Sequence, residues 1–210
     1  AAVASIEARS QVLPVPVPDE RFREGPGEWP AVPHLVWNHR WEYDKGPDRL
    51  LALLRVLRRR GQLFRLSLVG ESFRQAPEAF ACIRAEFADE LVNVGFMENR
   101  EAYDRLLGEA DMVLSTALHD FQGLAVQEAM AAGCVPLVPD RLAYPEYVAA
   151  DCRYPSHEAD PEQEGAVAAE KLMAVLANPR PGPATIMPQR YRSSRVIPEY
   201  RQVFESLLQS

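Results

Sequence analysis

Long apolar runs are absent from this sequence. No stretch reaches the ~18 consecutive apolar residues typical of a membrane-spanning helix, and the chain does not open with a charged and then apolar leader. We therefore expect neither a membrane span nor a secretory signal. Cysteine is scarce as well: Cys82, Cys134 and Cys152 are an odd number at wide spacings. They form neither a metal-ligand pattern nor a disulfide framework, which favours a reducing, cytoplasmic location.

Lysine is nearly absent too. Lys45 and Lys171 are the only lysines among the 210 residues, and arginine supplies the other basic side chains. A net charge of −7 gives no overall attraction to nucleic acid, because phosphate binding needs a local basic surface. Basic residues do gather between residues 40 and 74, which suggests a local anion site. For residues 58–60 the alternative is a solvated helix end, where the helix macrodipole favours cations.

The composition itself describes a globular chain. With 210 residues and 47% hydrophobic side chains, the sequence can bury a sizeable core. That length fits one large domain or two small ones at ~150 residues per domain. Proline recurs at every second position from Pro14 to Pro18, which imposes extended backbone. We therefore predict a linker over residues 1–31, a folded domain over residues 32–185 and a C-terminal helix over residues 186–210.

Short apolar strands alternate with helical segments along the rest of the chain. Apolar spacing predicts strands at 34–38, 63–69, 91–94, 112–115 and 135–138, and helices at 47–60, 76–87, 100–108, 123–132, 161–177 and 198–208. This alternation is typical of an α/β fold, a Rossmann-like parallel sheet flanked by helices. Such sheets bind ligands beyond the carboxyl ends of their strands, so the loops that follow strands are the candidate sites.

The loop after the first strand carries two cations. Arg40 and Lys45 bracket a turn, and Gly46 then opens a helix. A phosphate in this loop could gain both cations and the amides of the helix N-terminus. In the alternative, Arg40 pairs with Glu42 or Asp44 on the surface, where such pairs contribute little.

The segment from residue 116 to 133 carries two acids. Asp120 lies just before a predicted helix and can contact a ligand or simply cap that helix. Glu128 lies two turns further along, among alanines and apolar residues. Because burial of an unpaired charge is expensive, Glu128 needs a partner. Ribose hydroxyls suit it, since an ionised carboxylate only accepts hydrogen bonds and a diol offers two donors. Gly123 permits close approach of a diphosphate to the helix amides.

These residues together resemble a known family. The stretch from residue 32 to 148 is similar to the C-terminal, donor-binding half of the retaining GT-B glycosyltransferases, and within them it resembles most the tRNA-queuosine mannosyltransferases. That family places an arginine and a lysine five residues apart after its first strand, and two acids separated by seven residues at a helix start. The matching segments are HRWEYDK at 39–45, VGE at 69–71, VGF at 94–96, ADMVLSTA at 110–117, residues 119–128 and YPE at 144–146.

The resemblance implies a role for each matched residue. Arg40 and Lys45 would hold the donor diphosphate and offset its charge as it leaves, and Asp120 would contact the sugar hydroxyls where the family commonly has glutamate. The remaining donor-binding positions are Gly70 after the second strand, Phe96 and Met97 near the base, Gly123 and Leu124 through their amides, and Glu128 on the ribose.

The resemblance also implies partners. The donor would be a nucleotide-sugar, GDP-mannose being the expected one, and the acceptor queuosine in tRNA. No cofactor and no metal is expected, because His34, His39, His119 and His157 show no ligand spacing. A GT-B enzyme has two such domains, so we expect an N-terminal GT-B domain as partner, with most tRNA contacts, and little transfer by this chain alone. Two alternatives stay open: another hexosyl donor with a lipid, polysaccharide or small-molecule acceptor, and a non-catalytic nucleotide-binding module.

Overall fold

One parallel sheet organises the protein. The computed structural model describes residues 6, 9–23, 27–72, 76–181 and 187–208. Within these residues six strands form a sheet in the order β3-β2-β1-β4-β5-β6, and every adjacent pair is parallel. The strands are β1 (His34–Asn38), β2 (Arg65–Val69), β3 (Leu91–Gly95), β4 (Met112–Leu114), β5 (Val135–Pro139) and β6 (Arg153–Tyr154). The strand order reverses between β1 and β4, which is where a sheet of this kind binds ligands.

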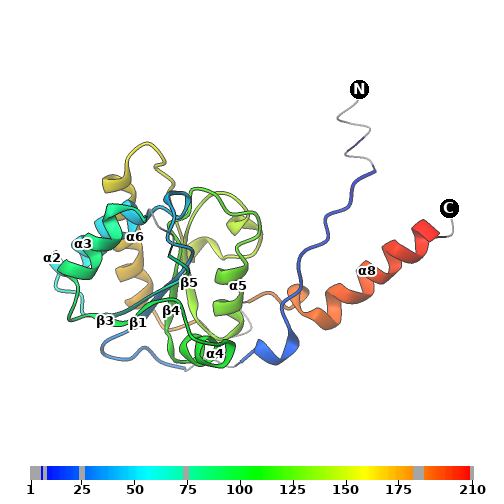
Figure 1. Ribbon diagram of the computed structural model, residues 1–210, viewed down its shortest axis with the longest axis horizontal. Helices are drawn as coiled ribbons and strands as arrows, with labels where there is room; N and C mark the ends of the chain where they lie inside the picture. The colour runs from blue at the N-terminus through cyan, green and yellow to red at the C-terminus, as the bar shows by residue number, and fades with distance from the viewer. Residues whose placement is uncertain (1–5, 7–8, 24–26, 73–75, 182–186, 209–210) are drawn as a thin grey trace.

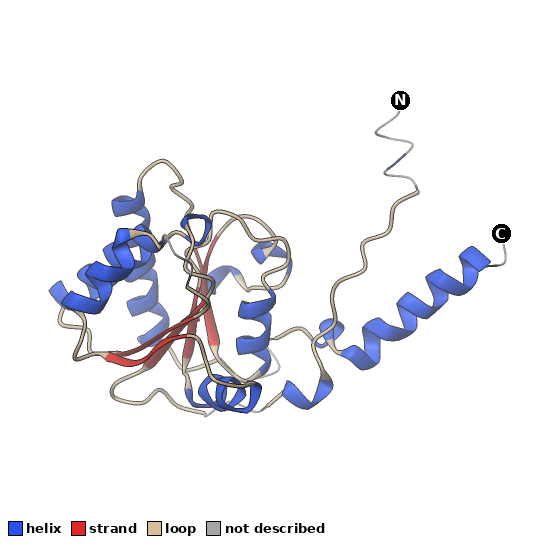
Figure 2. Ribbon diagram, in the orientation of Figure 1, coloured by secondary structure: helices blue, strands red, loops and turns tan. Residues whose placement is uncertain are grey.

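Helices cover both faces of the sheet. Helices α2, α3 and α6 lie on one side and α4 and α5 on the other (Figure 1), and Figure 2 shows the strands enclosed between them. The helices are α2 (Pro47–Arg59), α3 (Glu78–Glu86), α4 (Arg100–Glu109), α5 (Leu124–Ala131), α6 (Pro161–Leu176) and α8 (Ser193–Leu208). The predicted fold class, a Rossmann-like parallel sheet flanked by helices, is confirmed.

The core follows from the apolar spacing of the sequence. Leu50, Leu53, Leu54 and Leu57 recur at helical intervals along α2, and all four are almost completely buried. Strands β1 and β5 are buried along their whole length, as expected for central strands that have helices on both faces. The predicted strand and helix boundaries are close to the observed ones because this burial pattern is regular.

One strand was missed and the start of one helix was predicted wrongly. Strand β6 was not predicted, and the last helix begins at Ser193 rather than at residue 198, so that Pro198 lies inside α8. Short 3-10 helices also occur, of which η1 (Asp19–Arg21), η2 (Tyr43–Lys45) and η3 (Tyr144–Glu146) border the candidate site.

The start of α8 is fastened to the N-terminal segment. The Asp19 carboxylate accepts hydrogen bonds from the Ser194 amide (2.8 Å) and from both the Ser193 and Ser194 hydroxyls (2.6 and 2.8 Å). These hydrogen bonds, that of Ser193 first, lower the pKa of Asp19 to about 2. Val17 is buried and pairs with Arg192. The N-terminal segment and α8 leave the body on the same side (Figure 1).

The division into three segments stays a prediction. The predicted boundary between residues 185 and 186 lies outside the described residues. In the described part of the chain, no helix is both long and apolar enough to cross a bilayer.

Candidate functional site: three hollows at the carboxyl edge of the sheet

The loop after β1 holds Lys45 firmly and Arg40 loosely. Lys45 is buried; its ammonium donates a hydrogen bond to the His119 carbonyl at 2.6 Å and lies 3.1 Å from Asp44 Oδ2. Arg40 is about half exposed (53%) and lies 3.2 Å from Glu42 and 3.9 Å from Asp44, so the surface pairing considered from the sequence does occur. Such pairs are weak and easily exchanged.

Gly46 closes this loop against the next one. It adopts a left-handed conformation (φ +63°), and a Cβ at this position would lie 2.1 Å from the Thr116 carbonyl oxygen. The Thr116 hydroxyl donates a hydrogen bond to the Lys45 carbonyl at 2.7 Å, and the Leu118 amide donates one to the Asp44 carbonyl, also at 2.7 Å. The loops after β1 and β4 are therefore joined across the point where the strand order reverses.

Asp120 is fixed from two sides at the entrance to α5. Its carboxylate accepts a hydrogen bond from the Gly123 amide at 3.2 Å and another from the Tyr144 hydroxyl at 3.0 Å. Burial, and next the Asp120 charge, raise the pKa of Tyr144 well above its usual value, so this hydroxyl remains a donor. Gly123 has φ +73°, and a Cβ there would lie 2.3 Å from the Tyr147 hydroxyl. Each carboxylate oxygen keeps capacity to accept one more hydrogen bond.

These two loops and the first turn of α5 surround a hollow of about 780 Å³, called here the charged hollow after its charged side chains. Among the residues that line it are Asn38, Arg40, Lys45, His119, Asp120, Gly123 and Leu124. The amides of a first helical turn have no intrahelical acceptors, so the start of α5 offers hydrogen-bond donors to an anion.

His39 lines the same hollow as a neutral group. It is buried, and burial lowers its pKa to about 4. Among the described residues its Nε2 has no hydrogen-bond partner. At neutral pH His39 therefore adds no positive charge to that of Arg40 and Lys45.

A second hollow, called the apolar hollow, lies beside the first and has a volume of about 440 Å³. Asn38 lines both, and the apolar hollow is also lined by Gly70, Phe96, Met97, Arg100 and Tyr103. Phe96 is 76% exposed, whereas the Tyr103 hydroxyl accepts a hydrogen bond from the Asn38 side chain at 2.8 Å. This hollow offers aromatic and sulfur surface, with Glu98 and Arg100 as its charged side chains.

Glu128 lies in a third and smaller hollow of about 280 Å³, called the Glu128 hollow, which Arg100 shares with the apolar hollow. Its carboxylate forms an ion pair with Arg21 of η1 and lies 3.3 Å from Arg100 Nη1. The partner expected for this acid is thus supplied by two arginines of the same chain.

The structure therefore groups the predicted site residues in three neighbouring places. Arg40, Lys45, Asp120, Gly123 and Leu124 line the charged hollow; Gly70, Phe96 and Met97 line the apolar hollow; Glu128 lies in its own. Their roles stay predictions.

Sequence reasoning missed Asn38, Tyr144, Arg21 and Arg100 as parts of this site. Asn38 ends a strand and Tyr144 belongs to the YPE segment, so both carried a signal. The two arginines carried none. In the described part of the chain no group of three or more histidine, cysteine, aspartate or glutamate side chains could hold a metal ion.

Comparison with known proteins places this geometry in context. The family model described as "Glycosyl transferases group 1" matches residues 23–184. The tRNA-queuosine alpha-mannosyltransferase of Drosophila melanogaster is 40% identical over 153 residues, which are 67% of this chain and 40% of that protein. The GDP-mannose:cellobiosyl-diphosphopolyprenol alpha-mannosyltransferase of Xanthomonas oryzae pv. oryzae (strain PXO99A) is 26% identical over 107 residues, 50% of this chain and 28% of that protein. The chain thus spans less than half the length of these relatives.

Solved structures share the fold. The pneumococcal O-GlcNAc transferase GtfA, in complex with UDP and GlcNAc, has a TM-score of 0.72 at 15% identity over 94% of this chain and 39% of that one. The C-terminal domain of the group 1 family protein LpcC from Francisella tularensis has a TM-score of 0.61 at 18% identity over 77% of this chain and 88% of that domain. The sheet and its helices match the GT-B glycosyltransferase fold, and the chain belongs to the group 1 glycosyl transferases.

Proposed function

We propose that this chain is the donor-binding half of a retaining glycosyltransferase that takes mannose from GDP-mannose and transfers it to queuosine in tRNA. The 40% identity to a tRNA-queuosine alpha-mannosyltransferase supports the acceptor, and the name of the more distant relative supports GDP-mannose as donor. Because the chain spans 40% of the first relative, the proposal assigns most acceptor contacts to an N-terminal GT-B domain. A reducing, cytoplasmic site of action is part of the same proposal.

The observation that carries the proposal is the charged hollow. Lys45, Arg40 and the first turn of α5 all line it. Two cations and a helix N-terminus in one hollow are a suitable environment for a diphosphate. The hollow lies at the carboxyl ends of β1 and β4, where the strand order reverses.

The present contacts leave both cations able to bind phosphate. A lysine ammonium has three donors, and two of those of Lys45 are directed at the His119 carbonyl and at Asp44. The third can bind a phosphate oxygen without loss of the other two. Arg40 must exchange its surface carboxylates for phosphate, which costs little because exposed ion pairs are weak.

Catalysis in this proposal is electrostatic. The bond between the anomeric carbon and the diphosphate breaks through an oxocarbenium-like state, and negative charge grows on the leaving nucleoside diphosphate. Fixed cations near that charge lower the barrier, and loss of one comparable fixed donor costs on the order of 3 kcal/mol in other enzymes. Asp120, held by Gly123 and Tyr144, accepts hydrogen bonds from the sugar hydroxyls.

The rest of the donor extends toward the other two hollows. Phe96 and Met97 offer apolar surface to the base, and aromatic side chains commonly stack on bases. Glu128 accepts the ribose hydroxyls in place of one of its two arginine partners. Arg100, which lines the apolar hollow as well, is positioned to remain in contact with the nucleotide.

Calorimetric titration of the chain with GDP, UDP and GDP-mannose tests the donor half of the proposal. We expect GDP to bind, and Lys45→Ala and Glu128→Ala each to weaken it at least about tenfold, because each removes a charge-assisted hydrogen bond. Lys171→Ala is the matched control, since it removes the only other lysine, on α6. Equal indifference to every nucleotide would instead favour a non-catalytic module.

The acceptor requires a second experiment. The chain is joined to the N-terminal half of the Drosophila relative, and transfer of mannose from GDP-mannose is measured with queuosine-containing tRNA, tRNA without queuosine and a diphosphopolyprenol-linked sugar. Transfer only to queuosine-containing tRNA supports the proposal. Transfer only to the polyprenol-linked sugar supports the lipid alternative and contradicts the tRNA acceptor.

A further inference from the structure

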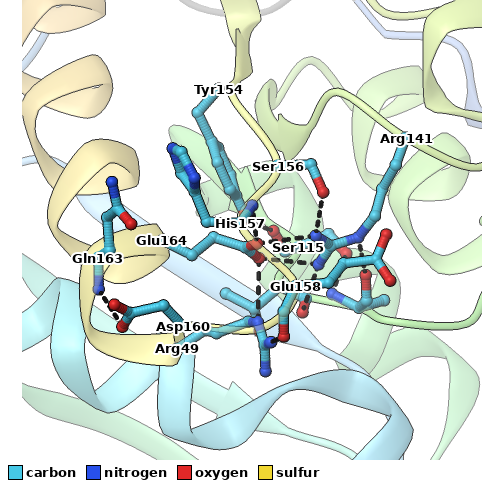
Figure 3. A network of polar contacts seen from close by, with 12 residues as sticks. Arg49, Ser115, Arg141, Tyr154, Ser156, His157, Glu158, Asp160, Gln163 and Glu164 are labelled. Carbon is cyan, nitrogen blue, oxygen red and sulfur yellow. Dashed lines mark hydrogen bonds and ion pairs between the residues drawn. The ribbon is translucent and has the colours of Figure 1, made fainter.

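A buried ion cluster contacts the loop after β4, which also lines the charged hollow. Glu164 of α6 is fully buried, and its two carboxylate oxygens lie 2.8 and 2.9 Å from the two terminal nitrogens of Arg141 (Figure 3). Arg49 of α2 approaches the same carboxylate from another direction, with Nε 3.1 Å from Oε1. Arg49, Arg141 and Glu164 form what we call the buried triad.

The buried triad is expensive to maintain. Removing charges from water usually costs as much as their mutual attraction returns, so apolar side chains of similar size would serve stability equally well. Burial alone would raise the pKa of Glu164, yet the hydrogen bonds from Arg141 and the His157 amide outweigh it and lower that pKa. Glu164 is therefore ionised, and two arginines share one carboxylate. Such an arrangement gives orientation, because an arginine paired through two nitrogens has a fixed direction.

The direction fixed in this way is toward the loop after β4. Arg141 Nε donates a hydrogen bond to the Ala117 carbonyl at 3.0 Å, and a terminal nitrogen lies 3.5 Å from the Thr116 carbonyl. The other terminal nitrogen also donates to the Ser156 hydroxyl at 2.8 Å. Arg141 thus joins the buried triad to Thr116 and Ala117, which lie three and two residues before His119 in the chain.

The same peptide is held from the opposite side by the loop that carries Lys45. The Thr116 hydroxyl donates to the Lys45 carbonyl, the Leu118 amide donates to the Asp44 carbonyl, and the Lys45 ammonium donates to the His119 carbonyl. Residues 116–119 therefore lie between Arg141 and Lys45. A shift of this peptide would change the distance between Lys45 and Asp120 across the charged hollow. Arg141 does not line the hollow itself.

We propose that Arg141 is a positioning residue for donor binding: Glu164 and Arg49 fix its guanidinium, and the guanidinium fixes the Thr116 and Ala117 carbonyls, which keeps Lys45 and Asp120 at the spacing a diphosphate needs. This inference rests on the proposed function of the charged hollow. In this proposal Arg141 does not contact the donor, yet it contributes to the affinity for the donor.

The test compares Arg141→Lys with Arg180→Lys. Arg180 is an equally buried arginine that pairs with Asp111 at 2.6 Å and donates to the Asp111 and Gly133 carbonyls, before β4 and β5 at the opposite edge of the sheet. Both substitutions keep the charge and lose the planar guanidinium. General loss of stability should therefore be similar in the two variants, whereas loss of donor affinity should not.

Two measurements are made on each variant. Hydrogen exchange of the Leu118 amide, followed by NMR without nucleotide, reports on the loop alone. Calorimetry with GDP reports on the hollow. We expect Arg141→Lys to speed exchange at Leu118 and to weaken GDP binding about tenfold, since a small misplacement of binding groups is enough for such a loss. Arg180→Lys should leave both unchanged. Ser156→Ala, which removes one hydrogen bond of Arg141, is the milder variant should Arg141→Lys not fold, with about a threefold loss expected.

The outcomes separate the two proposals. Unchanged Leu118 exchange in Arg141→Lys, or equal GDP loss in Arg180→Lys, overturns the positioning role of Arg141. If Arg141→Lys does not fold, Ser156→Ala takes its place. The positioning role of Arg141 is then overturned if Ser156→Ala changes neither Leu118 exchange nor GDP binding. Absence of GDP and UDP binding by the wild-type chain overturns the proposed function, and the donor part of this inference with it. The exchange measurement then still decides whether Arg141 holds the loop.

Discussion

The charged hollow and the apolar hollow are neighbours that are built in opposite ways. In the charged hollow Lys45 and His39 are buried, and Lys45 and Asp120 already have partners. In the apolar hollow Phe96 stands 76% exposed. Lys45 and Asp120 would therefore meet a ligand from fixed positions, whereas Arg40 is about half exposed and a flat apolar ligand needs only surface. Changes at the buried groups of the charged hollow should therefore affect folding and binding together, whereas changes at the exposed Phe96 of the apolar hollow should affect binding alone.

The largest expected effect is on the charged hollow. Gly46→Ala would place Cβ 2.1 Å from the Thr116 carbonyl in a left-handed backbone conformation. We expect it to lower the free energy of unfolding by more than about 3 kcal/mol, from the conformation and the clash together. Urea unfolding measures this. Gly61→Ala is the control, because Gly61 has a similar φ of +71° and no atom within 4 Å of the new Cβ. A similar loss in both variants would show that the clash is unimportant.

An acid dependence of stability should come from the same hollow. Burial lowers the pKa of His39 from 6.5 to about 4, so the unfolded chain binds this proton more readily than the folded one. The stability linked to His39 is therefore complete above pH 6.5 and is lost as the pH falls toward 4, by on the order of 3 kcal/mol.

Urea midpoints between pH 4 and 7 test this dependence. His39→Phe keeps a ring that can pack on Trp37 and should make the acid loss smaller, with His34, whose pKa burial also lowers, still contributing. An identical pH profile for His39→Phe and the wild type would contradict the assignment.

The smallest effect concerns the apolar hollow. Phe96→Ala should leave the unfolding midpoint unchanged, because the side chain is exposed, and should weaken GDP binding about tenfold through loss of contact with the base. Phe96→Ala should not change the affinity for inorganic diphosphate, whereas Lys45→Ala should lower the affinity for both GDP and diphosphate. Phe204→Ala on α8, with 60% exposure, is the control. A loss of diphosphate affinity in Phe96→Ala would show that the two hollows do not act separately.

Local sequence pattern was sufficient for most of the fold. Each of the first five strands is a short apolar run followed by a helical pattern, and burial acts on that pattern directly. Strand β6 was not predicted because two residues, Arg153 and Tyr154, are too few to show an alternating apolar pattern. The start of α8 at Ser193 could not be predicted locally, because the Asp19 carboxylate that accepts a hydrogen bond from Ser193 lies 174 residues earlier in the chain.

The same limit explains the candidate site. Arg40 and Lys45 belong to one loop, so their spacing alone could suggest a shared role. The need of Glu128 for a partner could also be inferred, but Arg21 and Arg100 lie 107 and 28 residues away, and no local signal connects them. The contacts of Arg141 with the site could not be predicted for a further reason. They are made to backbone carbonyls, which every residue possesses, so no residue type in the loop indicates them.

The Asp19 carboxylate has a practical consequence for any shortened version of this protein. It holds the first residues of α8, while Val17 next to it is buried against the same region. A version trimmed beyond residue 19 keeps α8 but leaves the first amides of that helix without their acceptor. A version that ends before Ser193 leaves the Asp19 carboxylate with Arg192 but without its three hydrogen bonds from Ser193 and Ser194. The first and last segments of the chain must be kept, or removed, as a pair.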